Sequence, residues 1–222
     1  MEKRFFVLPL LLLLSFMAQS QILSERFDSR VSIGAEVFTD FNVGSGYDNF
    51  SLRGINQGIS AQITYNFPIG ESKHTTSLGV GFSSHNFYMK GCMLNTPYAD
   101  SLVFQNIEHD YKRAKINVNY IDIPLEVNMR IADMFKISVG FKFGILTTGK
   151  TKYVGEIDDT DQIWRIKNSR IENLAKYVYS ATLRIAYKSV YVFGAYQFNS
   201  TYDPVTGMDL RPLSVGIGVR PF

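Results

Sequence analysis

Residues 121–131 read IDIPLEVNMRI, and large apolar side chains occupy every odd position of this stretch. The even positions carry Asp122, Pro124, Glu126, Asn128 and Arg130. Because successive side chains of a β-strand point to opposite faces, the pattern predicts a strand with one apolar and one polar face. The same alternation can be followed in both directions along the chain.

Eight segments share this period of two and predict eight strands. They are residues 31–37, 55–67, 75–88, 121–131, 137–145, 177–188, 190–199 and 213–222. Segment 190–199 leaves open which of its two faces is the apolar one. No segment from Arg30 onward has 18 or more consecutive apolar residues, and this excludes helical membrane spans.

Alternating strands of this kind fit either a secreted β-sandwich or an antiparallel barrel closed within a membrane. The polar face of these strands is rich in Gly and Ser and carries few charges. A narrow barrel interior needs such a face, whereas a water-facing sheet usually carries abundant Lys, Glu and Thr. We therefore predict an all-β fold, an eight-stranded antiparallel up-and-down transmembrane β-barrel.

The expected connections alternate in length, as they do in outer-membrane barrels. The long ones are residues 40–53, 89–115, 147–176 and 200–211, and the short ones are 68–74, 132–135 and 188–189. A barrel that starts in the periplasm has long outer loops and short inner turns, so this alternation assigns the strand ends to their sides. Within the third long loop, Ser169 and Glu172 have capping-box spacing, which permits a short helix unless tertiary contacts override it.

Residues 1–20 read as a secretory signal peptide. A basic start precedes an apolar run, and Ala18 and Ser20 supply the small side chains that signal peptidase accommodates. We expect the mature protein to begin at Gln21 and residues 21–222 to form the outer-membrane barrel domain. A single-span inner-membrane anchor is the alternative, but it would need a run of about 20 apolar residues.

Composition and charge exclude several classes of protein. The 222 residues contain one cysteine, Cys92, which excludes disulfide scaffolds and cysteine-ligated metal sites. Basic residues number 23 and acidic residues 20, and so small an excess does not support a nucleic-acid surface. The acidic run from Glu156 to Asp161 lacks EF-hand spacing, so we expect a solvated loop, no bound metal and no cofactor.

Aromatic residues make up 14% of the chain, and girdles at the two membrane interfaces would explain this fraction. Six aromatic residues lie near expected strand ends: Tyr88, Tyr177 and Tyr179 at outer ends, and Tyr65, Phe67 and Tyr187 at periplasmic ends. The sequence closes on Phe222, which we expect to act as a C-terminal signal for the barrel-assembly machinery.

Charged residues on the polar face predict how the lumen is filled. Glu36, Glu126, Lys142 and Arg184 fall at a similar height above the periplasmic strand ends, and Asp122 shares their face. Unpaired charges in a narrow space of low dielectric cost several kcal/mol each, so we expect these groups to pair and plug the interior. Lys142 is expected to couple to Glu126, either directly opposite it or diagonally between Asp122 and Glu126. The alternative is a water-filled lumen.

A catalytic site has few candidate residues. His85 shares the polar face of its strand with Ser83, and it could approach Asp122 across the neighbouring hairpin, as a lipid-active enzyme would require. Lumen walls are ordinarily polar, so we expect no catalysis there. Pro124 removes a backbone donor from its strand and predicts a bulge or a kink in the wall.

Two motifs carry a resemblance to a known family. Residues 119–125 read NYIDIPL and residues 211–218 read RPLSVGIG. With these motifs the chain resembles, from about Val31 to Phe222, the small outer-membrane β-barrel domain family that includes PorT-like proteins. The resemblance implies an eight-stranded barrel and says nothing about activity. Residues 196–202 depart from the family pattern, which suggests a different fourth outer loop.

Together these features predict a monomeric, non-enzymatic barrel in the outer membrane of a Gram-negative bacterium. Its expected partners are outer-membrane lipid and the barrel-assembly machinery, with an envelope or secretion protein as a further candidate, and no nucleic acid. The expected role is structural or interactive, through the long outer loops or as an accessory of envelope secretion. The alternatives are a narrow small-solute channel and, less strongly, a lipid-active outer-membrane enzyme.

Overall fold

The computed structural model describes residues 30–44, 50–94, 102, 104–157, 162–171 and 173–220. The expected leader, the expected start at Gln21 and the terminal Phe222 lie outside the described residues. The expected domain boundaries, the cleavage site and the assembly signal therefore stay predictions.

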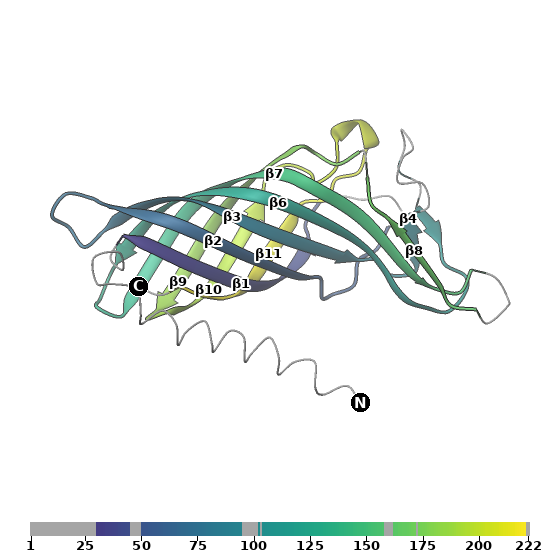
Figure 1. The fold of residues 1–222 in the computed structure, drawn as a ribbon, viewed down its shortest axis with the longest axis horizontal. Helices are drawn as coiled ribbons and strands as arrows, with labels where there is room; N and C mark the ends of the chain where they lie inside the picture. The colour runs from purple at the N-terminus through teal and green to yellow at the C-terminus, as the bar shows by residue number, and fades with distance from the viewer. Residues whose placement is uncertain are drawn as a thin grey trace, which may run out of the picture.

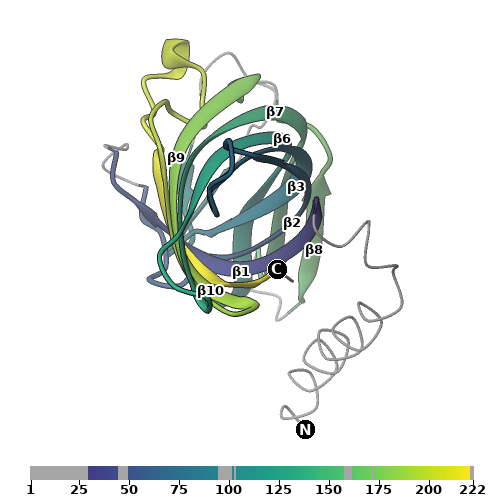
Figure 2. The same ribbon diagram turned by 90° about the vertical axis from the view of Figure 1, so that its left-hand side faces the viewer.

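Eight antiparallel strands form a closed barrel, which confirms the predicted fold class (Figures 1 and 2). They are β1 (Val31–Asn42), β2 (Gln57–Pro68), β3 (Thr75–Tyr88), β6 (Tyr111–Arg130), β7 (Phe135–Gly155), β9 (Tyr177–Tyr187), β10 (Val190–Gln197) and β11 (Pro212–Val219). Each strand pairs with its neighbours along the chain, and β1 pairs with β11 to close the ring. Every barrel strand therefore has a partner on both sides, so the wall has no free edge.

Four smaller elements lie at one end of the barrel. Strands β4 (Cys92–Leu94) and β5 (Phe104–Asn106) pair with each other, and β8 (Trp164–Asn168) pairs with the outer part of β7. A short 3-10 helix, η1 (Pro204–Thr206), lies in the connection between β10 and β11. Figure 1 shows β4 and β8 together at the far end of β6 and β7, beyond the other barrel strands. Among the described residues, no helix has the length and apolar character that crossing a membrane requires.

The connections alternate between the two ends of the barrel as expected. Short turns at 69–74, 131–134 and 188–189 lie at one end, and the described parts of the longer segments 43–56, 89–110, 156–176 and 198–211 lie at the other. Two expected loops, however, proved too long. Strand β6 begins at Tyr111 and β7 continues to Gly155, so both strands run well into the regions 89–115 and 147–176 that were expected to be irregular.

The reason for this error is an inversion of the alternation within β6. On the periplasmic side of Tyr120, where residue numbers are higher, the apolar side chains are odd-numbered and exposed, as Ile121 and Leu125 are. On the outer side of Tyr120, where residue numbers are lower, the apolar side chains are even-numbered and buried, as Ile116 and Val118 are. The strand continues straight through, but its apolar face changes from outward to inward. A strand that leaves hydrocarbon for water must change in this way, because its outward side then faces solvent.

A β-bulge marks the same height on the neighbouring strand. Asn119 pairs with Thr148 and Tyr120 with Leu146, so Thr147 is an extra residue on β7. The Thr147 hydroxyl donates a hydrogen bond to the carbonyl oxygen of Asn119 at 2.9 Å. The bulge moves the inward positions of β7 from even numbers to odd numbers, so Gly149, Thr151 and Tyr153 point inward above it.

Pro124 produces no bulge, because the β3–β6 register is the same on both sides of it and the proline only interrupts ladder pairing. A kink in the wall, the alternative expected at Pro124, stays a prediction. The short helix considered at Ser169 and Glu172 is not seen in the described part of this segment. Ser169, Arg170 and Ile171 form no helical turn, because the segment follows β8 and Ile171 packs into the outer core, and Glu172 lies outside the described residues.

The lipid-facing side of the barrel is a band of exposed apolar residues. Val80 is 61% exposed, and Ile59 and Ile217 are each 56% exposed. In strand β10, whose face was ambiguous, Val190 and Val192 point outward while Tyr191 and Phe193 are buried inside. Both faces of this strand are apolar because aromatic rings fill the lumen at this position.

Glycines on adjacent strands make room for these rings. A Cβ on Gly58 would lie 2.0 Å from the ring of Phe38, and a Cβ on Gly218 would lie 2.3 Å from the ring of Tyr191. Any larger residue would collide with an inward-facing ring at either position. Glycine on the lumen face is therefore part of the packing of a narrow barrel.

We expect the purified protein in mild detergent to migrate differently on a gel before and after boiling. A barrel without free edges resists unfolding by detergent until it is heated. A variant that ends at Arg211 lacks β11 and cannot close, so it should give one band under both conditions. Identical migration of the full chain before and after boiling, together with water-soluble fractionation, would contradict a closed membrane barrel.

Candidate functional site: the barrel interior and its outer cap

The barrel interior contains a buried layer of paired charges. Arg184 of β9 donates through Nε to Glu36 Oε1 of β1 at 3.0 Å, and its NH1 group contacts Glu126 of β6. Ser60 and Tyr191 donate their hydroxyl groups to the Glu36 carboxylate. Each of these side chains occupies an inward position of its strand, and the register between the strands brings them to one height.

Arg220 is the second cation of this layer, and the sequence analysis missed it. Its NH1 group lies 2.8 Å from Glu126 Oε2, and its NH2 group lies 3.4 Å from Glu126 Oε1. Two arginines thus neutralise two glutamates in the layer. A signal was present in the sequence, since Arg220 continues the inward series Ser214, Gly216 and Gly218.

Lys142 lies at a different height from the one expected. It pairs in register with Pro124, and its Nζ atom is 3.4 Å from Asp122 Oδ2. Of the two registers left open for β6 and β7, the structure has the diagonal one. The Lys142 ammonium group pairs with Asp122, and both arginines contact Glu126. The expected coupling of Lys142 to Glu126 is therefore replaced by these two sets of ion pairs.

His85 lies above these charges and pairs with Asp40, not with Asp122. The distance from His85 Nδ1 to Asp40 Oδ2 is 2.8 Å, and Ser214 Oγ donates to the other oxygen of Asp40. Because the Ser214 hydroxyl donates to the carboxylate, the three groups are not in the order of a nucleophile activated by a histidine base. His85 and Asp40 are buried, and the arrangement joins β3, β1 and β11.

A small cavity lies between this group and the Asp122–Lys142 pair. Its volume is about 10 Å³, and its walls include Ser83, His85, Asp122 and Lys142. A cavity needs a volume of roughly 10–15 Å³ of this kind to hold one water molecule. The space is therefore far too small for a lipid or sugar substrate.

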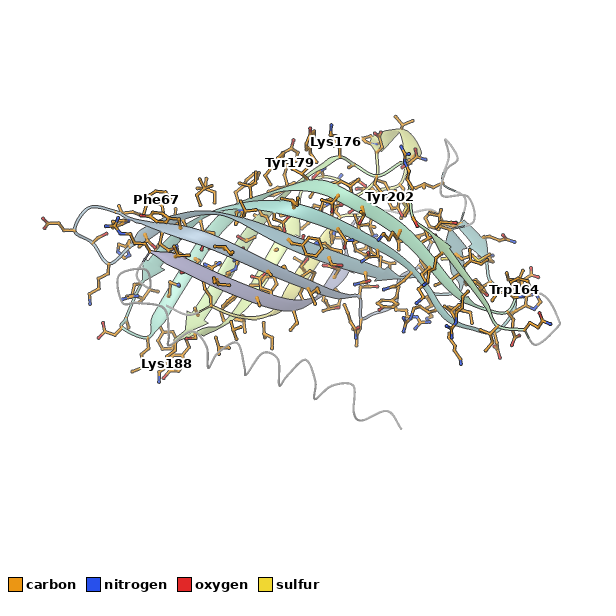
Figure 3. The ribbon with its side chains drawn as sticks, in the orientation of Figure 1. Phe67, Trp164, Lys176, Tyr179, Lys188 and Tyr202 are labelled. Atoms are coloured by element: carbon orange, nitrogen blue, oxygen red, sulfur yellow. The ribbon has the colours of Figure 1, made fainter. Side chains whose placement is uncertain are left out.

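An apolar core closes the outer end of the lumen. It is built from inward side chains of the upper barrel strands and from the outer connections, namely Phe87, Met89, Cys92, Leu94, Leu102, Phe104, Ala114, Ile116, Val118, Tyr120, Tyr153, Ile171, Leu174, Val178, Tyr202, Met208 and Leu210. We call this part of the molecule the outer cap. Tyr202, labelled in Figure 3, is fully buried in it, and burial raises the pKa of its phenol above the ordinary value.

Cys92 is a buried member of the same core. Burial raises the pKa of its thiol, and neutral thiols are poor nucleophiles and poor metal ligands. Among the described residues, no group of three or more His, Cys, Asp or Glu side chains is arranged to hold a metal ion. Of the acidic run considered for Ca²⁺, Asp158, Asp159 and Asp161 lie outside the described residues.

The six expected interface aromatics all occupy outward positions. Phe67 and Tyr187 lie near the periplasmic end and Tyr179 near the outer part of β9, and Figure 3 labels Phe67 and Tyr179 at these two places. Several contact a second ring: Tyr65 with Phe67, Tyr187 with Phe135, and both Tyr177 and Tyr179 with Phe143. Tyr88 packs beneath Lys115. Their role as membrane anchors stays a prediction.

Comparison with protein families gives one match. The profile of a family described as "Outer membrane protein beta-barrel domain" matches residues 17–204. A comparison with curated proteins finds no match.

Solved structures give weaker similarity. Ail, the attachment invasion locus protein of Yersinia pestis, solved in complex with the heparin analogue sucrose octasulfate, is 15% identical, with coverage of 86% of this chain and 96% of that chain and a TM-score of 0.35. A chain described as "Asymmetric conductivity of engineered proteins" is 8% identical, with coverage of 86% and 99% and a TM-score of 0.20. Neither similarity carries a conclusion about function.

We expect Arg184→Met to destabilise the protein by about 3–5 kcal/mol, because it leaves a buried carboxylate without its cation. The double variant Arg184→Met with Glu36→Gln should recover much of this loss. The neutral amide that replaces the carboxylate can accept from one of the Ser60 and Tyr191 hydroxyl groups and donate to the other, while Glu126 keeps Arg220. Urea unfolding in lipid vesicles, analysed as a double-mutant cycle, measures the coupling.

The matched control is Lys73→Met, which removes an exposed lysine paired with Asp133 at 3.3 Å. It should change the free energy of unfolding by less than about 1 kcal/mol. If the Arg184 and Glu36 losses were strictly additive, the charges would be independent of one another, as in a water-filled lumen.

Proposed function

The chain belongs to the outer membrane protein beta-barrel domain family, which locates it in the outer membrane of a Gram-negative bacterium, and on this basis we propose that it is a non-enzymatic, closed barrel that acts by presenting its outer cap to a protein partner. The packing of the outer cap is the observation that supports this proposal. The described parts of its connections are packed over a shared apolar core, which gives that part of the outer surface a defined shape.

The connection from β10 to β11 gives this surface an exposed apolar contact point. Val205 is 88% exposed, although Tyr202 and Met208 on either side of it are buried. Asp203 caps the 3-10 turn by accepting from the Val205 amide, and Gly207 ends it with a φ of 69°. An apolar residue fixed at an exposed turn loses little conformational entropy on binding, which favours a contact role.

Trp164, at the start of β8, is a second candidate contact point. It is the one tryptophan of the chain, it is 46% exposed, and Figure 3 shows it at the far end of the long β6–β7 extension. Tryptophan is enriched among residues that dominate binding energy at protein interfaces. Val205 and Trp164 are therefore the side chains that we propose to contact the partner.

The small-solute channel is the competing function, and the interior argues against it. The charged layer of Glu36, Glu126, Arg184 and Arg220 fills the middle of the lumen, and the core of the outer cap covers its outer end. A lipid-active enzyme is supported still less, because the cavity next to His85 has a volume of about 10 Å³. The proposed protein is monomeric, and its other partners are outer-membrane lipid and the barrel-assembly machinery. The PorT-like resemblance makes an envelope secretion protein one candidate partner.

We expect the wild-type protein to show no discrete conductance steps in a planar lipid bilayer. The double variant Arg184→Ala with Tyr191→Ala removes two large side chains from the charged layer and should be tested beside it, with insertion of both proteins verified by protease protection. Regular current steps from the wild type would contradict the closed lumen and favour the channel.

We expect a photocrosslinking residue at Val205 or Trp164 to capture a specific protein in intact envelopes, with the product identified by mass spectrometry. The controls carry the same residue at Ile217, which faces lipid, and at Glu71, in a periplasmic turn. Capture from Glu71 alone would contradict an outer-surface role and favour a periplasmic secretion accessory. No protein adduct from Val205 or Trp164 in cells that yield adducts elsewhere would also contradict the proposal.

A further inference from the structure

The outward face of β6 and β7 is divided into three zones along the strands. Nearest the periplasm it is apolar, and this zone ends at Ile121 on β6 and Ile145 on β7. Neutral hydrogen-bonding side chains follow, namely Asn119, Asn117 and Thr148. Beyond them the same face becomes basic.

The basic zone continues across three adjacent strands. Lys115 pairs in register with Lys152, and Lys152 pairs in register with Lys167 of β8. Directly opposed residues of an antiparallel pair project from the same face, and neighbouring strands lie about 4.8 Å apart, so these three lysines form one row. Arg113 and Lys150 flank the row on the same face. We call these five residues the basic face.

The basic face points away from the outer cap. Ala114, Ile116 and Tyr153 occupy the alternate positions of the same strands and are buried in the cap core. Within the part of the chain that the structure describes, none of the five basic side chains forms an ion pair. Lys115 donates to Asn86 Oδ1 at 2.6 Å and lies over the ring of Tyr88, both on the neighbouring strand β3.

A row of like charges on adjacent strands opposes folding, because directly opposed like charges repel. An anionic ligand would offset this repulsion. We propose that the basic face binds the phosphate-bearing headgroup of an anionic glycolipid of the outer leaflet, with the acyl chains of that lipid against the apolar zone below and its sugars beside the neutral zone. The order of the three zones is the order of chemical groups along such a lipid.

The height of the basic face favours a glycolipid over a phospholipid. Lys115 lies six residues beyond Ile121, and Lys150 lies five residues beyond Ile145. With about 3.3 Å per residue and a strand tilt of about 40°, these ammonium-bearing positions stand roughly 10–15 Å above the hydrocarbon. The headgroup zone of a phospholipid leaflet is only about 5–8 Å thick. Phosphates on an extended sugar headgroup lie at the height of the basic face, whereas those of a phospholipid lie several ångströms below it.

This inference does not depend on the proposed protein partner. The basic face is on the outside of the wall, continuous with the lipid-facing band, and the contact residues Val205 and Trp164 are not part of it. Binding of a lipid at the wall and binding of a protein at the cap can therefore succeed or fail separately.

The test uses the full-length protein in detergent micelles and measures binding of purified rough-type lipopolysaccharide, which carries phosphates on its inner core and on its lipid part. Native mass spectrometry counts the bound lipid, and a titration gives the affinity. The second ligand is the same lipopolysaccharide after chemical dephosphorylation, and the third is a soluble polyphosphate at equal phosphate concentration.

The test variant carries Lys115→Gln, Lys150→Gln, Lys152→Gln and Lys167→Gln. The matched control loses four other exposed lysines through Lys73→Gln, Lys90→Gln, Lys176→Gln and Lys188→Gln, so its net charge is identical. Melting of both variants by the gel-shift assay shows whether the barrel is intact. All four test positions are on the outward side of the extension, away from the lumen and the cap core.

We expect the wild type and the control variant to prefer phosphorylated over dephosphorylated lipopolysaccharide by about tenfold or more, and the test variant to lose that preference. The preference should weaken as salt is raised, because partly exposed charges are screened. Equal binding of both lipopolysaccharides by the wild type would overturn the proposal. So would binding of soluble polyphosphate as tight as that of the lipid, since this would assign the face to a soluble anion, or an equal loss in both variants, since net charge would then be the cause.

Discussion

Hydrocarbon offers no hydrogen-bonding partner to a backbone amide, and this constraint determines the rest of the molecule. A sheet can satisfy it only by closing, so the pairing of β1 with β11 is the contact on which all other contacts depend. Closure in turn encloses a lumen too narrow for bulk water, and charged side chains in that space need partners. The ion pairs around Arg184 and the glycines beneath Phe38 and Tyr191 follow from the same closed ring.

The sequence predicts the strands inside the membrane well because lipid and lumen impose opposite chemistry on alternate residues. It predicts the outer ends poorly, since the rule linking apolar side chains to outward positions reverses at Tyr120. Ala114, Ile116 and Val118 alternate as regularly as Ile121, Ile123 and Leu125, but on the opposite face. A search for a change of face, and not for a loss of alternation, would have extended β6 to its full length.

Three members of the lumen layer were predictable, but Arg220 and the pairing of the charges were not. Parity places Glu36, Glu126 and Arg184 inside, but which cation meets which carboxylate depends on the register between strands, which parity alone does not determine. A two-residue difference in register moves a side chain by about 7 Å, more than the length of an ion pair. The sequence left both registers open for Lys142, and only the structure relates it to Asp122 and relates Arg220 to Glu126.

The reach of these ion pairs along the chain has a consequence for the charge of the interior. Glu126 meets Arg220 across 94 positions, and Glu36 meets Arg184 across 148. The two glutamates and the two arginines of the layer therefore come from strands near both ends of the chain and from its middle. A barrel that lacks β1 or β11 has an unbalanced charge inside, so charge neutrality of the interior is a property of the complete ring and of no smaller part of it.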